Sequence, residues 1–176
     1  MTSASTRART PAQWGCRIAE IRAIYEEIQR ERNQGRGTTA TRRFDYHSPQ
    51  CQSTYPVQAT SLWRDDAGRP RAYVVDKTAS HRETMQIERY YDHEGRLRFV
   101  LLNRFPGETR VYLGTEGAVL WAVSRDHGAD AIEPYDRDNW ETKPSTAAEA
   151  KVEFEGAAEC PEVKHRRSLR GLMSSG

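Results

Sequence analysis

A short phrase that recurs three times in the middle of the chain constrains its fold more than any other feature. In each copy an aromatic residue stands five positions before a glycine, and a turn-forming Asp or Gly stands three positions before it. The glycines are Gly68, Gly95 and Gly117, and an arginine directly follows the first two. An aromatic strand end, a polar turn with a glycine at positive φ and an alternating apolar strand together are typical of a β-hairpin. The phrase therefore predicts three consecutive hairpins.

One stretch before the hairpins has the period of a helix. In residues 17–32, large apolar side chains recur at spacings of three and four, at Ile18, Ile21, Ile24, Tyr25 and Ile28. This spacing builds one apolar stripe on an α-helix. Glu26 and Arg30 lie on the other face as an i,i+4 pair in the favourable order. A helix of this length is marginal alone, so the stripe must pack on another element, and the sheet is the only one large enough.

The remaining strand signals complete the predicted fold class. Strands are expected over residues 38–47, 57–64, 71–76, 83–91, 96–102, 110–113 and 118–123. Short turns between successive strands favour an antiparallel order in which neighbours in sequence are neighbours in the sheet. The sequence therefore predicts an α+β or mainly β fold: an N-terminal amphipathic helix packed on an antiparallel β-meander of six to seven strands.

The chain divides into one domain and two tails. Residues 1–16 are rich in Ala, Arg, Thr and Ser and are expected to be a disordered leader. Residues 17–140 hold the helix and the meander. Residues 141–176 are expected to be a polar, largely disordered tail with a short helix near residues 146–152. At 176 residues, a single domain with tails is the expected organisation.

Charge is distributed in blocks, and we expect the acidic and basic segments to solvate the chain or to pair with each other. Residues 1–43 carry a net +5, residues 44–125 +1, residues 126–162 −8 and residues 163–176 +4. Basic ends could contact phosphates, but the C-terminal end has no aromatic residue for base stacking, so nucleic acid is the less favoured partner. The chain has no run of about 18 apolar residues, so no membrane span is expected.

The cysteines leave the cellular compartment open. Cys51 and Cys160 flank the predicted β core and would form a disulfide in an oxidising compartment, whereas in the cytosol all three cysteines would be reduced thiols. Residues 1–15 contain no apolar segment of a signal peptide. The expected location is therefore periplasmic or secreted if a leader is missing from this sequence, and cytoplasmic otherwise.

No motif assigns a catalytic, metal or cofactor site. None of the five histidines stands at a metal-ligand spacing from another, and the acidic stretch at residues 126–138 lacks the glycine and terminal glutamate of a calcium loop. The sequence also lacks a nucleophile elbow, a phosphate-binding loop and a dinucleotide fingerprint. We therefore expect no metal and no cofactor, and a non-enzymatic protein is favoured over an enzyme.

The second copy of the phrase carries a resemblance to known proteins. Residues 90–97, with Tyr90, Tyr91, Asp92, Gly95 and Arg96, resemble the YD repeats of large bacterial cell-surface and toxin proteins. A short helix followed by such hairpins also resembles a group of small uncharacterised exported bacterial proteins. YD-repeat proteins carry many tandem copies, whereas this chain has two good copies and a divergent third. The resemblance implies a β architecture and a location in the cell envelope, but it does not imply any particular activity.

These observations predict a non-enzymatic binding or structural module of the bacterial cell envelope or secreted space. Its partner would be a protein or another envelope component, bound by outward aromatic and arginine side chains of the sheet. The candidates are Tyr73, Tyr90, Arg96 and Arg98, which flank the predicted turns. Two alternatives remain open: a small cytoplasmic enzyme with a dispersed His, Asp and Arg site, and a nucleic-acid-associated protein that uses its basic termini.

Overall fold

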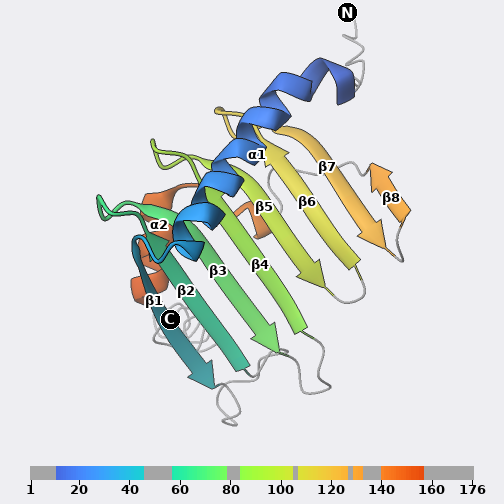
Figure 1. Ribbon diagram of the computed structural model, residues 1–176. Helices are drawn as coiled ribbons and strands as arrows, with labels where there is room; N and C mark the ends of the chain where they lie inside the picture. Colours follow the sequence, from blue (N-terminus) through green and yellow to red (C-terminus); the bar gives the residue numbers. More distant parts are fainter. Residues whose placement is uncertain are drawn as a thin grey trace, which may run out of the picture.

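The computed structural model describes residues 11–45, 57–78, 84–104, 107–126, 129–132 and 140–156, and it confirms the predicted fold class. One long helix lies on an antiparallel sheet whose strand order follows the chain order (Figure 1). The sheet has eight strands, one more than the upper limit of the prediction. The elements are α1 (Pro11–Asn33), β1 (Thr38–Asp45), β2 (Val57–Arg64), β3 (Pro70–Thr78), β4 (Thr84–Tyr91), β5 (Leu97–Arg104), β6 (Gly107–Leu113), β7 (Val119–Asp126), β8 (Ala129–Ile132), η1 (Trp140–Thr142) and α2 (Ala147–Gly156).

Helix α1 packs on the sheet through the predicted apolar stripe. Ile18, Ile21 and Ile28 are buried, and Ile24 is half-buried beside them. The helix begins at Pro11, within the predicted leader, where proline is well suited to the first helical turn because its missing N–H has no partner there. Burial of the stripe stabilises the helix, because most of the stability of a helix in a protein comes from the packing of its apolar face.

The three predicted hairpins form, and their turns are alike. In each turn the glycine N–H donates to the carbonyl of the residue three before it, over 2.8–3.0 Å. The φ angles of Gly68, Gly95 and Gly117 are 76°, 76° and 73°, which confirms the predicted positive φ at the first two. This left-handed conformation is easy only for glycine, so the turn geometry explains why the glycine recurs.

Each hairpin also has a β-bulge that the sequence pattern did not reveal. The strand register shifts once between β2 and β3, once between β4 and β5 and once between β6 and β7. The residues left without a partner in the register are Arg71, Arg98 and Leu120, each three positions after the turn glycine. A bulge breaks the strict alternation of side chains along a strand. Arg98 and its neighbour Phe99 therefore both lie on the side of the sheet that faces α1.

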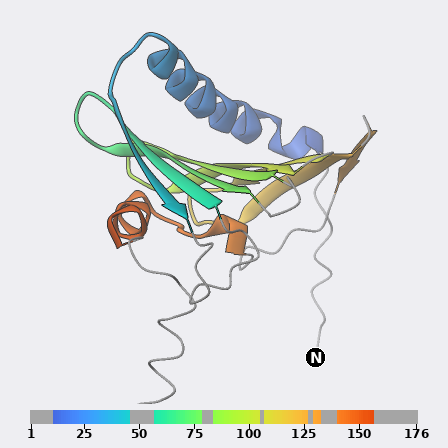
Figure 2. The ribbon, with the colours of Figure 1, turned by 90° about the horizontal axis from the view of Figure 1, so that it is seen from below.

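Two layers of side chains cover the two faces of the sheet. The α1 face carries Trp63, Tyr90, Phe99 and Tyr112, packed against the isoleucines of α1. The opposite α2 face carries Leu62, Tyr73, Ile87, Val100 and Val111, packed against Ala147, Ala150 and Phe154 of α2. Seen along the sheet, α1 lies on one side, and α2 and η1 lie on the other (Figure 2). The sheet is thus the middle layer of three.

The C-terminal part of the structure differs from the prediction. The short helix expected near residues 146–152 is present as α2, and its buried side chains make residues 147–156 part of the core rather than of a disordered tail. Strand β8 was not predicted, because its four residues are too few for an alternating pattern.

The proposed Cys51–Cys160 disulfide lies outside the described residues, and Cys16 is an exposed free thiol on α1. No described helix is long and apolar enough to cross a membrane.

Candidate functional site

The aspartate of each of the first two turns organises its hairpin. Asp65 Oδ1 accepts hydrogen bonds from the backbone N–H of Ala67 at 3.1 Å and of Arg69 at 2.9 Å. Asp92 Oδ1 accepts from Glu94 and Arg96 at the same two distances. In both turns the arginine after the glycine donates its Nε–H to the other carboxylate oxygen, at 2.9 and 2.8 Å. The predicted turn role of the aspartates is therefore confirmed, and the arginine binds the aspartate.

The hydrogen bonds keep both carboxyl groups ionised. Burial by itself would raise the pKa of Asp65 and Asp92, because water solvates a charge better than protein does. The backbone and side-chain donors of the following arginine outweigh burial, with Arg98 a further donor to Asp92, and they hold both pKa values below the usual range. Each turn thus carries a fixed negative charge at neutral pH.

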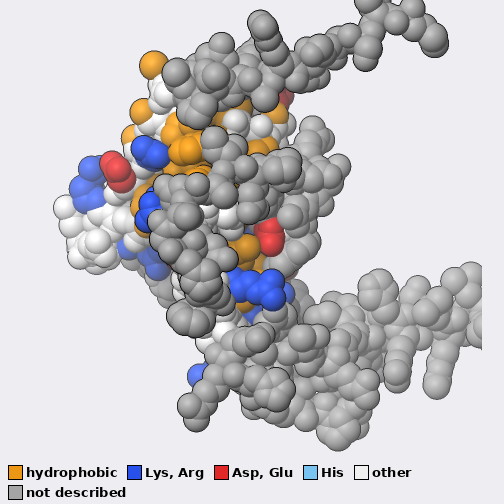
Figure 3. All heavy atoms as spheres, turned by 90° about the vertical axis from the view of Figure 1, so that its right-hand side faces the viewer, with side chains coloured by type: hydrophobic (Ala, Val, Ile, Leu, Met, Phe, Trp, Pro, Cys, Tyr) orange, Lys and Arg blue, Asp and Glu red, His pale blue; other side chains and the backbone are white. Residues whose placement is uncertain are grey.

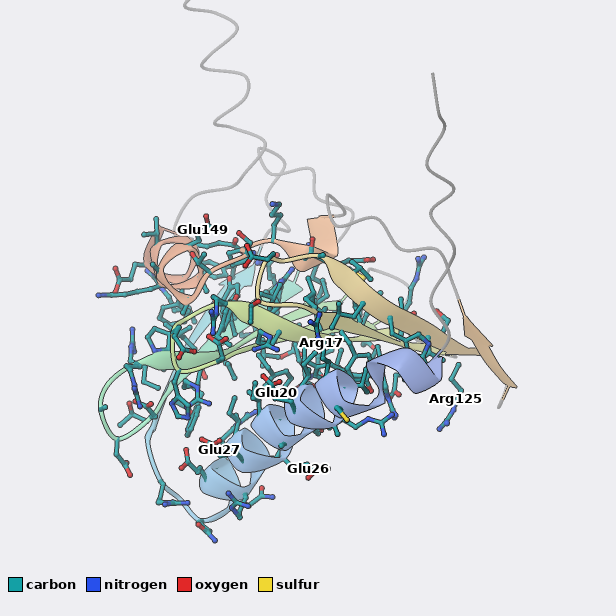
Figure 4. The ribbon with its side chains drawn as sticks, turned by 90° about the horizontal axis from the view of Figure 1, so that it is seen from above. Arg17, Glu20, Glu26, Glu27, Arg125 and Glu149 are labelled. Carbon is teal, nitrogen blue, oxygen red and sulfur yellow. The ribbon has the colours of Figure 1, made fainter. Side chains whose placement is uncertain are left out.

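The bulge arginines link these aspartates to α1. The Arg98 side chain is 4% exposed and lies 3.3 Å from Asp92 and 3.3 Å from Glu20 of α1. The Arg71 side chain is 1% exposed and lies 3.8 Å from Asp65 and 3.5 Å from Glu27. Figure 4 shows Glu20 and Glu27 on the same flank of α1. Two equivalent clamps, each made of a turn aspartate, a bulge arginine and a helix glutamate, therefore hold this flank to the hairpins.

One histidine joins the first clamp. The Nδ1 atom of His93, in the second turn, lies 2.8 Å from Arg71, and its Nε2 atom lies 3.3 Å from Glu27. This is the one place in the described structure where a His, an Asp and an Arg meet, as the enzyme alternative requires. Arg71 also donates to the Tyr91 carbonyl oxygen at 2.9 Å, and none of the described cavities is lined by these residues. The cluster joins both turns to Glu27 of α1.

The predicted binding residues do not form one outward surface. Tyr73 and Tyr90 are fully buried on opposite faces of the sheet, and Arg98 is buried in the second clamp. Their hydroxyl groups are occupied as well: Tyr73 donates to Glu153 of α2 at 3.0 Å, and Tyr90 binds Glu88 and Gln29. Arg96 is the exposed member and lies at the turn beside Asp92. The expectation of outward side chains is therefore met at Arg96 alone, because α1 covers Tyr90 and Arg98 and α2 covers Tyr73.

A groove opens on the other flank of α1. It is a hollow of about 320 Å³ between α1 and strands β5 and β6. We call it the α1 groove, and it is lined by Arg22, Tyr25, Glu26, Phe99, Leu101, Glu108, Arg110 and Tyr112. In Figure 1 the helix crosses the sheet obliquely and leaves the lower parts of β5, β6 and β7 in front uncovered. The helix position, which is fixed by the clamps, therefore creates the groove.

The floor of the groove is aromatic and its walls are charged. The Phe99 and Tyr112 ring centroids are 5.0 Å apart, and Tyr25 stands edge-on to Phe99 at 5.3 Å. A second hollow of about 420 Å³ continues the groove toward Trp121 and shares Arg22 and Glu26 with it. Viewed from the β8 side, the coloured part of the surface also sets hydrophobic side chains next to basic ones (Figure 3). Such a combination of apolar floor and few charged groups is typical of a ligand site.

Two charged groups of the groove form no ion pair with a described residue, and one polar group beside the groove has no described hydrogen-bond partner. Glu26 has no described hydrogen-bond or ion-pair partner, and the predicted Glu26–Arg30 pair is not formed. The contacts of Arg22 are a 3.5 Å bond from Nε to the Tyr112 hydroxyl and a position 5.7 Å above that ring. The buried indole N–H of Trp121 has no described partner. By contrast, Glu108 and Arg110 on the facing wall bind each other.

Neither metal chemistry nor a relative identifies this site. No group of three or more His, Cys, Asp or Glu side chains among the described residues is placed to hold a metal ion. Comparison with protein-family models, curated proteins and solved structures gives no significant match. The function has to be argued from the groove itself.

Proposed function

We propose that the protein is a non-enzymatic binding module and that the α1 groove is its binding surface. The observation that carries this proposal is an aromatic hollow of about 320 Å³ whose α1 wall holds two charged groups, Arg22 and Glu26, that form no ion pair with any described residue. Uncommitted charges beside apolar surface are available to a ligand, whereas the charges of the two clamps are already paired.

The use of titratable groups supports a binding role over an enzymatic one. The buried Arg71 and Arg98, with Asp65 and Asp92, join α1 to the hairpins. A catalytic site needs an acid or base within hydrogen-bond reach of a substrate, and His93 is held against Arg71 outside the groove. The location in the bacterial cell envelope or secreted space, with an envelope component as partner, remains part of the proposal and rests on the likeness of the hairpins to YD repeats.

The test is to compare two matched variants as bait. Leu101 lies on the groove floor, and Val123 is a half-buried apolar residue in the same cross-strand row that does not line the groove. After melting curves show that each is folded, wild type, Leu101→Glu and Val123→Glu are immobilised at high density. Extract from the native host is then passed over each column, and components that are only retarded by weak binding are recorded together with those that are retained. We expect wild type and Val123→Glu to retain the same ligand or partner and Leu101→Glu to lose it.

Two results would contradict the proposal. Full capture by folded Leu101→Glu would show that the groove is not the binding surface. Turnover of a substrate that disappears in a single variant such as His93→Ala would show that the protein is an enzyme.

A further inference from the structure

We infer that the α1 groove binds a small zwitterion: an α-amino acid with an apolar or aromatic side chain. This inference rests on the proposed binding function and adds the class of ligand. It starts from two charges of opposite sign on the α1 wall that form no ion pair with any described residue: Glu26, and Arg22, whose described contacts are with the neutral Tyr112. Arg22 and Glu26 are both exposed, both line the groove, and no ion pair joins them.

The positions of these two residues fit a carboxylate and an ammonium group on one carbon atom. They are one helical turn apart, which places the Cβ atoms of such residues about 5–6 Å from each other on one flank of a helix. A carboxylate between them can accept two parallel hydrogen bonds from the Arg22 guanidinium, and an ammonium group can donate to Glu26. Tyr25 stands between them in sequence, and burial together with the Glu88 carboxylate raises its pKa, so its hydroxyl is a neutral partner at physiological pH.

The opposite charges also discriminate against simpler ligands. An anion without an amine would pair with Arg22, but Glu26 would repel it and stay unpaired. A cation without a carboxylate would pair with Glu26, but Arg22 would repel it and stay unpaired. The facing wall does not change this balance, because Glu108 and Arg110 bind each other. The floor of Phe99, Leu101 and Tyr112 takes an apolar side chain, and a hollow of about 320 Å³ is at the small end of ligand sites.

The test uses three probes that differ by one charged group: L-phenylalanine, 3-phenylpropionate and phenethylamine. Binding to the full chain is followed by amide chemical shifts, which measure weak affinities and locate the site. For a ligand of this size we expect a dissociation constant on the order of a millimolar for L-phenylalanine. Each of the other two probes should bind at least about tenfold more weakly, because it lacks one charge-assisted hydrogen bond. The shifts should centre on Leu101, Tyr112 and the middle of α1.

Variants assign each charge to its partner. Glu26→Gln should weaken L-phenylalanine about tenfold and leave 3-phenylpropionate no weaker, and Arg22→Gln should weaken L-phenylalanine and leave phenethylamine no weaker. Arg30→Gln, one turn beyond Glu26 and outside the groove lining, is the control and should change nothing.

Equal affinity for the three probes, or no shifts at the groove, would overturn the ligand class. If this happens while folded Leu101→Glu still loses the captured partner, the groove remains the binding surface and its ligand is of another kind. If Leu101→Glu also keeps its partner, the ligand class and the proposed function both fall.

Discussion

The residues of the second clamp can be replaced by those at the equivalent positions of the third hairpin, which has no charges there. The stability of the variants then tests whether the charges of the clamp depend on one another. In the third hairpin Gly114, Ala118 and Leu120 take the places that Asp92, Arg96 and Arg98 have in the second hairpin. A Cβ atom added at Gly114 would lie 3.4 Å from the Leu120 side chain, so leucine fills the space that the ion pair occupies in the second hairpin. The substitutions are Asp92→Gly, Arg96→Ala and Arg98→Leu, made singly and together.

The structure gives unequal magnitudes for the single changes. Asp92→Gly leaves Arg98, 4% exposed, with only Glu20 and the Leu113 carbonyl oxygen, and breaking a buried pair in this way costs about 3–5 kcal/mol of unfolding free energy. Arg98→Leu should cost about 1–2 kcal/mol, because Asp92 keeps its other donors and Glu20 is mostly in water. Arg96→Ala should cost the least of the three, because the Arg96 side chain is 42% exposed and water screens its pair with Asp92.

The triple variant has no orphaned buried charge, so we expect it to be at least about 2 kcal/mol more stable than the sum of the singles implies. The assay is urea unfolding, with the free energy taken from the midpoint and slope. Asp92→Gly should be the least stable of the four variants, and the triple variant should be more stable than that single change. Additivity within about 0.5 kcal/mol would refute the reasoning, because it would mean that Arg98 and Asp92 do not depend on each other.

Three further predictions concern the helix, the turns and pH. Ile21→Asp buries a charge beneath α1 and should lower the unfolding free energy by several kcal/mol. Ala23→Asp, on the exposed side of α1, should change the unfolding free energy by less than about 0.5 kcal/mol. Equal melting temperatures of these two variants would show that α1 is not docked on the sheet. Gly95→Val should destabilise more than Gly68→Val in urea unfolding, since both glycines have φ near 76° but only at Gly95 would a Cβ meet another residue, Ala147 at 3.3 Å. Burial raises the pKa of Tyr90 and Tyr91 in the folded protein. The unfolding free energy should therefore fall as pH rises above about 10, because tyrosines of the unfolded chain ionise there. Tyr90→Phe should reduce this loss when unfolding is measured as a function of pH.

The sequence predicted the hairpins because their signals are local. A turn glycine at positive φ and an aspartate that accepts turn N–H groups are properties of four or five consecutive residues, and both are found at Gly68 and Gly95 with Asp65 and Asp92. The helix was equally accessible, since a stripe such as that of Ile18, Ile21 and Ile28 needs only the period of the helix. The short strand β8 and the packing of α2 depend on tertiary contacts. For that reason β8 was not predicted, and α2 was predicted as part of a tail rather than of the core.

The candidate site was not accessible from sequence because bulges and helix placement decide it. Strict alternation along β5 separates Arg98 from Phe99, and the bulge puts both on the α1 face, where α1 buries Arg98. Tyr73 and Tyr90 were expected outside because they flank the turns, yet α2 covers Tyr73 and α1 covers Tyr90. One signal was present: Glu20 and Glu27 are two helical turns apart, and Arg71 and Arg98 occupy the same place in two copies of one repeat.

That signal also explains why the groove lies where it does. At about 100° per residue, Glu20 and Glu27 fall within about 20° of each other around α1, whereas Arg22 and Glu26 lie about 200–240° from Glu20. The buried isoleucines occupy the arc between the two pairs, so α1 rests on the sheet with a charged pair on either flank. On the flank that faces the hairpins, Glu27 and Glu20 pair with the bulge arginines Arg71 and Arg98, and these ion pairs hold the helix. The other flank faces the open sheet, where the nearest charges, Glu108 and Arg110, already bind each other. The arrangement that fixes the helix is therefore also the one that leaves Arg22 and Glu26 available to a ligand.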